Sequence, residues 1–351
     1  MTGPLRILAG SAALEVLRDR GLDLSAFGWL IAAAGGSKFL VLGGLDRVLF
    51  PLLRETPRER PLRCIGSSIG SLRLACLFGS APHSALERVA AAYWAYERAV
   101  PVDGARFVRE IVGRALEGQE LAEVADPSFA RYTVLATECR GLTKSDRRSL
   151  LLPALGLAAA GNALSRRTLG LQFTRVAFHS RGDAGPLSAL RDLPTCHRRL
   201  TADNVEAVLI ASASVPMLVP GASIPGEGRS VYRDGALLDY HPVLHHAAEE
   251  LVLYPHFYPH VTPGWFDRSL PGRRARGEVL RRTVVLAPSA EFVSRLPGGA
   301  MPTRRDIRRF DDAERRRRWR AIWAHGRELG DALLDFLASP RRVSAEATLL
   351  A

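Results

Sequence analysis

A serine flanked by glycines at fixed spacing is the pattern in this chain with the clearest chemical potential. An apolar run ends in Gly66-x-Ser68-x-Gly70, and a second apolar run, 72–77, follows it. This layout is typical of a nucleophile elbow, in which a serine sits on a sharp turn between a strand and a helix. Glycine tolerates the dihedrals of such a turn, and the following helix directs its N-terminal N–H groups at the serine. We therefore expect Ser68 to attack an acyl group, as in a hydrolase or an acyltransferase.

A pair of glycines ahead of this serine is the candidate site for the negative charge that an attacked carbonyl oxygen acquires. The chain reads Gly35-Gly36-Ser37-Lys38 directly after an apolar, strand-like run. Consecutive glycines allow backbone N–H groups to converge on one point without obstruction by side chains. We expect these four residues, with Ser67 beside the nucleophile, to bind the oxyanion and the substrate. An ordinary strand-to-helix turn is the alternative interpretation.

The candidate base is an aspartate in a short turn far along the chain. Asp234 precedes Gly235 and follows an irregular segment, 216–228, that is rich in proline and glycine. An aspartate in this position commonly forms a turn, because its side chain accepts hydrogen bonds from the nearby backbone. A carboxylate bonded to the Ser68 hydroxyl would instead take the serine proton, provided that burial or direct contact with Ser68 tuned its basicity.

Together these motifs resemble, in order and rough spacing, those of the patatin-like phospholipases. That family has a Gly-rich oxyanion loop with a basic residue, then Gly-x-Ser-x-Gly, then Asp-Gly-Gly/Ala. A segment of the type Ala-Ser-x-x-x-Pro ahead of the Asp-Gly motif also agrees. The four motifs span about residues 30–240, and in chain order they are Gly35-Gly36-Ser37-Lys38, Gly66-x-Ser68-x-Gly70, Ala211-Ser212-Ala213-Ser214-Val215-Pro216 with Pro220, and Asp234-Gly235-Ala236.

The resemblance implies a fold and a mechanism. The fold is a three-layer α/β/α sandwich with a mostly parallel central sheet, in one domain over residues 1–351. Residues 28–240 carry the motifs, and 241–351 complete the sheet and add the C-terminal helices. The mechanism is that of a lipid acyl hydrolase, in which a Ser68–Asp234 dyad forms an acyl-enzyme on a lipid or other ester without a metal or cofactor.

The sequence departs from the family pattern in two places. Ala34 and Phe39 stand where the oxyanion motif of the family has glycine. The segment from His241 to Asp267 also has no counterpart in the general family pattern. We therefore expect a distinct bacterial-type subgroup. A scaffold of the same fold that binds a lipid or a partner without turnover remains an alternative.

Histidines gather after Asp234 and support a second mechanism. The order Ser68, Asp234 and then His256 or His260 also fits the Ser–Asp–His order of α/β-hydrolase triads. The Gly-rich loop and the Asp-Gly turn favour the dyad instead, with His241 and His256 as polar walls of the pocket or as part of a core network. His241 and His245 have the spacing of a metal pair on a helix, but no Glu or Cys arrangement accompanies them.

Composition limits the class of protein. The chain has 351 residues, 47% of them hydrophobic and 24% charged, which is typical of a globular protein. Its net charge of +12 comes almost entirely from arginine, and few aromatic residues accompany these charges, so we do not expect nucleic-acid binding. The densest run, Arg315 to Arg320, predicts a solvated helix face, with peripheral contact to an anionic membrane surface as the alternative.

The sequence also bears on the compartment. The four cysteines are scattered without a Cys-x-x-Cys pair, which predicts reduced thiols rather than a zinc site. We find no convincing signal peptide and no apolar run that is long enough to span a membrane. These observations predict a cytoplasmic protein.

Strand-like and helix-like patterns alternate along the chain, which predicts an α/β sheet with helices on both faces. Expected strands cover 28–34, 61–66, 132–137, 173–178, 251–254 and 283–286. Expected helices cover 7–21, 38–53 with an interruption at Gly43-Gly44, 68–78, 84–121, 155–164, 205–211 and 310–337.

Overall fold

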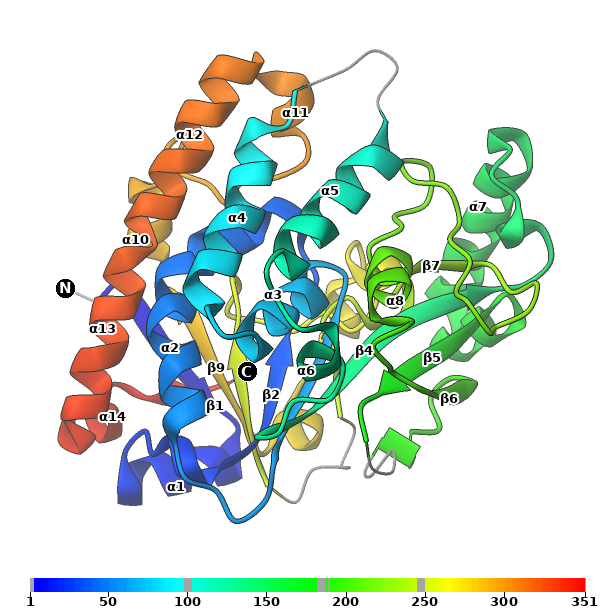
Figure 1. The fold of residues 1–351 in the computed structure, drawn as a ribbon. Coiled ribbons are helices and arrows are strands. Elements are labelled where there is room, and N and C mark those ends of the chain that lie inside the picture. Colours follow the sequence, from blue (N-terminus) through cyan, green and yellow to red (C-terminus); the bar gives the residue numbers. More distant parts are fainter. Residues whose placement is uncertain (1–2, 98–102, 182–186, 189, 245–249, 351) are drawn as a thin grey trace.

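The computed structural model describes residues 3–97, 103–181, 187–188, 190–244 and 250–350 (Figure 1). Its central feature is one mixed sheet in the order β10-β1-β9-β8-β2-β3-β4-β5-β6, with β7 paired to β4. The strands are β1 (Leu5–Ala9), β2 (Phe27–Ala32), β3 (Leu62–Ser67), β4 (Ala130–Cys139), β5 (Phe173–His179), β6 (Thr195–Arg199), β7 (Tyr232–Asp234), β8 (Leu251–Pro255), β9 (Thr283–Pro288) and β10 (Thr348–Leu349).

The middle of this sheet is parallel. Strands β9, β8, β2, β3 and β4 run in one direction, whereas β1 is antiparallel to β9, and both β5 and β7 are antiparallel to β4. The central strands are buried along most of their length, as expected of a parallel sheet with covered faces. The expected mixed α/β fold with a largely parallel sheet is confirmed.

Fourteen α-helices lie within the described residues, together with shorter 3₁₀ helices. The α-helices are α1 (Ser11–Arg20), α2 (Gly43–Glu55), α3 (Ile69–Phe78), α4 (Pro82–Ala95), α5 (Gly104–Leu116), α6 (Leu121–Ala125), α7 (Arg148–Leu164), α8 (Val205–Ser212), α9 (Ala236–Asp239), α10 (Ala290–Arg295), α11 (Asp306–Arg309), α12 (Asp312–His325), α13 (Arg327–Ala338) and α14 (Pro340–Glu346). The 3₁₀ helices are η1 (Leu24–Ala26), η2 (Gly36–Leu42), η3 (Gly141–Lys144), η4 (Arg166–Leu171), η6 (Trp265–Asp267), η7 (Pro271–Arg273) and η8 (Gly277–Leu280).

Helices α2, α3, α4 and α5 lie together over one face of the sheet, with α12 and α13 along the outside of α2 (Figure 1). Helix α7 stands at the opposite edge of the molecule, beyond β4 and β5. A fully buried ion pair joins α2 to α3, with Arg73 Nη2 2.6 Å from Asp46 Oδ1. Within the described residues, no helix has both the length and the apolar character to cross a bilayer.

Glycines lie at the points where three of the expected helices are divided. The expected helix over 7–21 is strand β1 followed by α1, and the two elements are separated at Gly10. The expected interruption at Gly43-Gly44 is the point where the 3₁₀ helix η2 ends and α2 begins. Glycine is needed at position 44 because a Cβ there would lie 2.1 Å from the carbonyl oxygen of Gly326. The expected helix over 310–337 is divided at Gly326 into α12 and α13. The start of α13 packs on the start of α2 at this point, with the backbones of Gly44 and Gly326 in contact.

Other elements differ mainly in their bounds. Helix α7 begins at Arg148 rather than at 155, and the expected helix over 84–121 comprises α4 and α5, with 98–102 between them outside the described residues. The six expected strands are confirmed to within a few residues. The four cysteines are free, and three of them are buried.

Candidate active site

Two strands meet end to end at the candidate site, and this arrangement brings Ser68 to Asp234. Strand β3 runs parallel to β4 and ends at Ser67, which is paired with Leu135. Strand β7 runs antiparallel to the same strand and ends at Asp234, which is paired with the next residue, Ala136. The carboxyl ends of β3 and β7 therefore face each other along one side of β4. A Cβ on Gly235 would lie 2.2 Å from the Leu135 carbonyl oxygen, so glycine is required where the two strands meet.

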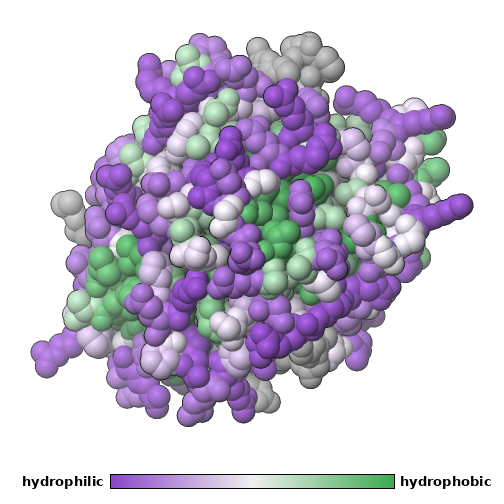
Figure 2. All heavy atoms as spheres, viewed as in Figure 1, coloured by the Kyte–Doolittle hydropathy of each residue, from purple (hydrophilic) through white to green (hydrophobic). Residues whose placement is uncertain are grey.

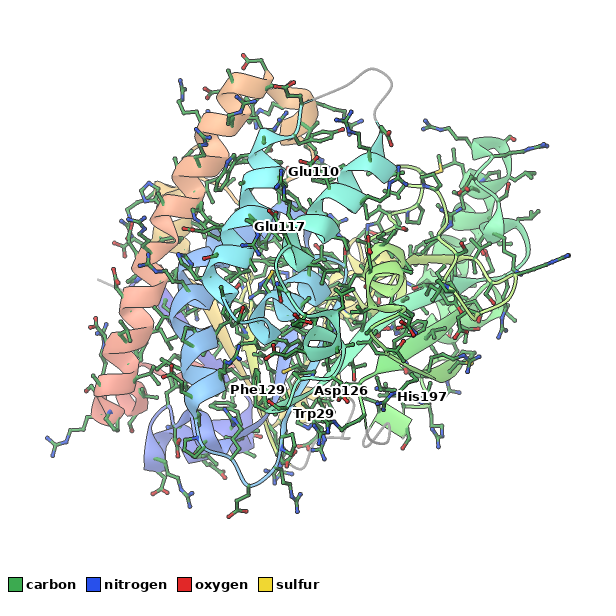
Figure 3. All side chains as sticks on the ribbon, in the orientation of Figure 1. Trp29, Glu110, Glu117, Asp126, Phe129 and His197 are labelled. Atoms are coloured by element: carbon green, nitrogen blue, oxygen red, sulfur yellow. The ribbon has the colours of Figure 1, made fainter. Side chains whose placement is uncertain are left out.

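The site lies at the carboxyl ends of the parallel strands, which is the usual place for ligands in open α/β sheets. Trp29 and Phe129, labelled in Figure 3, mark the opposite end. Trp29 is near the start of β2, and Phe129 directly precedes β4. Because β2 and β3 are adjacent and parallel, the loop after β2 and the turn after β3 leave the sheet side by side.

Ser68 has the strained backbone of a nucleophile elbow. Its φ of 54° and ψ of −131° are unusual for a residue with a side chain, and α3 begins at the next residue. A Cβ on Gly66 would lie 2.8 Å from the backbone of Gly70, and a Cβ on Gly70 would lie 2.2 Å from the carbonyl oxygen of Ala32. Both glycines are therefore needed because the first turn of α3 packs directly on the ends of β2 and β3.

Replacement of Gly70 tests this packing. We expect Gly70→Ala to lower the free energy of unfolding by about 3 kcal/mol or more, because backbone atoms must move to relieve the contact. The matched control is Gly113→Ala in α5, where a Cβ meets nothing within 4 Å. That change should raise stability by about 0.5–1 kcal/mol. Urea unfolding of both variants measures the difference, and equal stabilities would contradict the packing argument.

Ser68 and Asp234 are joined directly. The Ser68 hydroxyl donates a hydrogen bond to Asp234 Oδ2 at 2.8 Å, and Oδ1 accepts one from the Ala236 N–H at 2.8 Å. Burial raises the pKa of Asp234 from 3.8 to about 6, against the opposing effects of these two hydrogen bonds and of the Arg304 charge. The carboxylate therefore has the desolvation and the contact that a proton acceptor for Ser68 requires.

The segment 211–214 holds both residues of this pair. Ser212 Oγ accepts a hydrogen bond from the Ser68 backbone N–H at 2.9 Å and donates one to the Leu135 carbonyl oxygen at 2.7 Å. The Asp234 N–H donates to the Ser214 carbonyl oxygen at 2.9 Å. Ser212 is thus a positioning residue that we did not single out as a site residue, although the Ala-Ser-x-x-x-Pro resemblance covers it.

The Gly-rich loop presents unused backbone donors. The N–H groups of Gly35, Gly36 and Ser37 donate no hydrogen bond to any described residue, whereas the neighbouring Ala34 N–H donates to the Tyr240 carbonyl oxygen. Gly36 has a φ of 57°, and a Cβ there would meet nothing within 4 Å. Because η2 begins at Gly36, its first N–H groups are unpaired by geometry and available to an anion.

Lys38 is buried beside this loop. Its ammonium lies 3.4 Å from the Gly35 carbonyl oxygen and 5.7 Å from the centre of the Phe257 ring. Burial and the charges of Arg268 and Arg304 lower its pKa to about 8. Burial raises the pKa of Tyr240 to about 12, and the same two arginines oppose this rise. Positive charge therefore gathers around the loop.

The segment 256–258 supports the loop from behind. A Cβ on Gly35 would lie 2.5 Å from the tip of the buried Phe257 ring, so the ring fits against a glycine. His241 and His256 meet edge to face in the same cluster, with ring centres 4.2 Å apart. The segment that has no counterpart in the family pattern therefore packs against the Gly-rich loop.

The histidines are packing residues in this geometry. His241 and His256 are 1% and 0% exposed, so neither reaches an open pocket as a wall. Burial lowers the pKa of His256 to about 3 and that of His241 well below its ordinary value. Among the described residues, no histidine forms a hydrogen bond with Ser68 or Asp234. His245, which formed part of the metal alternative, lies outside the described residues, as does His246.

Ser67 is the last residue of β3 and directly precedes Ser68. It is fully buried, and its hydroxyl donates to the Asp239 carbonyl oxygen at 2.5 Å. The Ser67 hydroxyl is therefore engaged within the fold, and its role in substrate binding stays a prediction. The hydroxyl of Ser37 is also buried, without a partner among the described residues.

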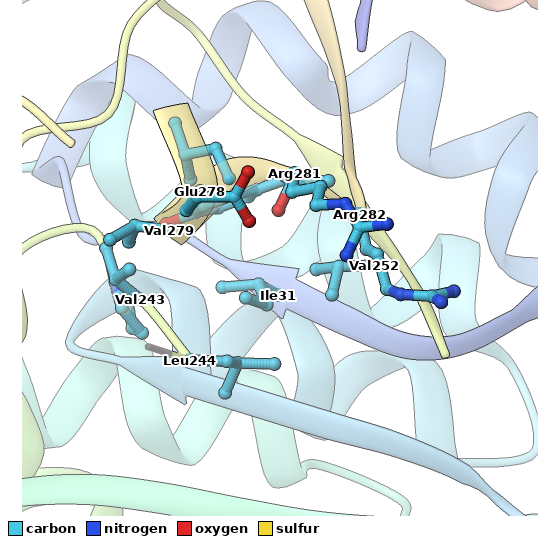
Figure 4. Close-up of a pocket in the computed structure, with 12 residues that line it drawn as sticks. Ile31, Val243, Leu244, Val252, Glu278, Val279, Arg281 and Arg282 are labelled. Atoms are coloured by element: carbon cyan, nitrogen blue, oxygen red, sulfur yellow. The ribbon is translucent and has the colours of Figure 1, made fainter. Parts of the chain in front are cut away.

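A separate pocket of about 280 Å³ lies elsewhere on the sheet (Figure 4). It is lined by Ile31, Val252 and Tyr254 from β2 and β8, and by Arg281 and Arg282 after η8. Its lining includes neither residue of the Ser68–Asp234 pair. It is therefore distinct from the candidate active site.

Comparison of the chain with protein-family models gives no match, and neither does comparison with curated proteins.

Proposed function

We propose that the protein is a lipid acyl hydrolase that cleaves carboxylic esters with a Ser68–Asp234 dyad, on a patatin-like α/β/α sandwich. The observation that carries the proposal is the 2.8 Å hydrogen bond from the Ser68 hydroxyl to a buried aspartate with a raised pKa. The strained conformation of Ser68 and the unpaired N–H groups of the Gly-rich loop support it. The free cysteines fit a cytoplasmic location.

The proposed reaction has two halves, formation of the acyl-enzyme and its hydrolysis, and each half includes two proton transfers. Asp234 takes the Ser68 hydroxyl proton while Oγ bonds to the ester carbonyl carbon, and the N–H groups of Gly36 and Ser37 stabilise the oxyanion. The intermediate then expels the alkoxide, which receives the proton from Asp234 and leaves as the alcohol. Water attacks the acyl-enzyme, Asp234 takes its proton and returns one to Ser68 Oγ, and the carboxylic acid is released.

The direct contact between Ser68 and Asp234 favours the dyad over a triad. A triad needs a histidine between the aspartate and the serine, each within hydrogen-bond distance of the imidazole. Here the carboxylate occupies the position next to the hydroxyl. The low pKa of His256 also makes it a poor proton acceptor at neutral pH.

Ester hydrolysis by histidine variants tests this proposal. The substrates are soluble nitrophenyl esters of short and long acyl chains, with phospholipid vesicles as a second set. We expect His260→Gln to retain kcat within about threefold, because His260 stacks on Tyr258 and has no contact with the dyad. His256→Gln should act mainly on stability, so folded protein must be assayed. Loss of kcat by more than about a hundredfold in folded His256→Gln or His260→Gln would favour a triad. No turnover of any ester by the wild type would favour the binding scaffold.

A further inference from the structure

Helix α7 has an inner face that belongs to the core. Leu151, Leu155 and Ala158 pack in one apolar cluster with Leu237 of α9 and Phe266 of η6. The end of the helix is also held, since Asn162 Nδ2 donates to Asp267 Oδ1 at 2.8 Å. These contacts fix the orientation of α7 and determine which side of it faces solvent.

The outer face of α7 is as apolar as the inner one. A helix that is apolar on all sides is normally buried in a core or in a membrane. No charged residue lies between Arg148 and Arg166 in the sequence. The outer face carries four exposed leucines. Their exposed fractions are 39% for Leu150, 60% for Leu152, 69% for Leu157 and 86% for Leu164.

Short elements beside α7 extend this apolar surface. Leu142 of η3, Leu171 of η4 and Trp265 of η6 are 56%, 79% and 36% exposed, and each of the three elements packs against α7. We call these three residues and the four exposed leucines of the helix the α7 face. Figure 2 shows hydrophobic side chains at the edge of the molecule where α7 lies, among hydrophilic neighbours. A cluster of this kind on a soluble chain marks an interaction surface.

Positive charges predominate around the α7 face, and the nearby Asp146 is paired with the buried Arg233. Lys144 and Arg147 precede the helix, Arg148 is its first residue and Arg167 follows it. None of the four forms an ion pair with a described residue. No Asp or Glu occurs from Arg147 to Arg181. Cations at both ends of an apolar face are complementary to anionic lipid headgroups around a hydrocarbon interior.

The arginine run of α12 does not provide such a surface. Its members are engaged within the fold: Arg315 with Asp312 and the Tyr96 carbonyl oxygen, Arg316 with Glu97, Arg317 and Arg318 with Glu314, and Arg320 with the Trp94 ring. The unpaired cations beside α7 are therefore the better candidates for contact with a charged membrane.

Hydrogen bonds connect the segments that flank α7 to the candidate active site. Arg233, which directly precedes Asp234, is fully buried and donates to the carbonyl oxygens of Thr143 and Ser145 ahead of α7. On the other side, Arg166 donates to the carbonyl oxygen of Leu238 in α9, the helix that follows Asp234. A surface bound through α7 would thus be held at a fixed position relative to the dyad.

We infer that the α7 face docks the protein on the surface of a bilayer that contains anionic phospholipids. The leucines and Trp265 enter the interfacial region, and the flanking cations contact the headgroups. The inferred purpose, delivery of a lipid ester to Ser68, rests on the proposed function. The binding itself does not, because it requires neither Ser68 nor Asp234.

Vesicle sedimentation tests the inference in a Ser68→Ala background, where the lipid is not consumed. The vesicles contain equal parts of phosphatidylcholine and phosphatidylglycerol, with pure phosphatidylcholine for comparison. We expect Leu152→Gln/Leu157→Gln to weaken partitioning by about tenfold or more. The matched control, Leu334→Gln/Leu349→Gln, removes leucines that are 48% and 60% exposed on other elements and should bind normally. Arg148→Gln/Arg167→Gln should lose about tenfold of the preference for anionic vesicles.

The outcomes separate this inference from the proposed function. Absence of binding to either vesicle, or equal binding by the α7 and control variants, would overturn the docking surface. A change in oligomeric state in the α7 variant without vesicle binding would overturn it too, in favour of an interface between copies of the chain. Vesicle binding without turnover of any ester by the wild type would refute the proposed function and leave the docking surface intact.

Discussion

Replacement of Ser68 by alanine is expected to lower kcat on a soluble ester by about a thousandfold or more, to the level of the uncatalysed reaction. The variant has no nucleophile, and the remaining donors of the Gly-rich loop have no covalent intermediate to stabilise. The pKa of Asp234 should rise further above 6 in this variant, because the Ser68 hydroxyl no longer stabilises the carboxylate. Steady-state kinetics and an NMR titration of the carboxyl group measure the two effects.

A matched serine shows whether this loss is chemical or structural. Ser289 is also buried, and its hydroxyl accepts the Phe292 N–H at the start of α10. Ser289→Ala should cost about 1 kcal/mol of stability through the lost cap and leave kcat unchanged. If folded Ser68→Ala retained more than about a tenth of the wild-type kcat, Ser68 would not be the nucleophile.

Replacement of Asp234 by asparagine is expected to remove activity and to stabilise the fold at neutral pH. The folded pKa of Asp234 is about 6, above its ordinary value of 3.8, so the folded state binds the proton more tightly than the unfolded state. Stability therefore falls as pH rises from about 4 to 6, and above pH 6 the charged group costs about 3 kcal/mol. Asparagine carries no charge, and its amide can still accept from Ala236 and pair with Ser68.

The expected gain depends on pH in a way that urea unfolding can follow. Asp234→Asn should gain about 1–3 kcal/mol at pH 8 and progressively less toward pH 4. The matched control is Asp239→Asn, because Asp239 is buried in an ion pair with Arg175 at 2.7 Å. That change should destabilise the fold by about 3–5 kcal/mol, since it removes a negative charge that compensates the buried charge of Arg175. A loss of stability in Asp234→Asn at pH 8 would contradict the argument that burial of the charged Asp234 carboxylate destabilises the fold.

The sequence is informative about the site where the backbone itself needs particular residues. Gly66 and Gly70 are needed by the packing of α3 on β2 and β3, and Gly35 by the approach of the Phe257 ring. Such constraints leave a local pattern that can be read without the fold. Ser68 and Asp234 were singled out from these patterns, and the structure brings them into contact.

Other features left no local signal. Strand β7 has only three residues, and its position opposite the end of β3 depends on long-range pairing with β4. The burial of the histidines likewise depends on how 256–262 packs on the Gly-rich loop. Residues 5–9 have an apolar pattern that fits either a strand or a helix, and tertiary pairing with β9 makes them a strand.

The exposed face of α7 could not be predicted either. An uncharged, apolar helix is typical of a core element, and only the structure shows that four of its six leucines face solvent. The arginine run of α12 is conspicuous in the sequence, but its ion pairs with Glu97 and Glu314 depend on how α12 packs and could not be predicted.

Mass spectrometry after reaction with a fluorophosphonate ester tests the central claim most directly. A serine activated by the buried Asp234 should form one covalent adduct per folded chain, and peptide mapping should place it on Ser68. Ser68→Ala should form none, and Asp234→Asn should react at least a hundredfold more slowly, on the order of a lost general base. An adduct on another serine, or equal rates in the wild type and Asp234→Asn, would contradict the Ser68–Asp234 dyad.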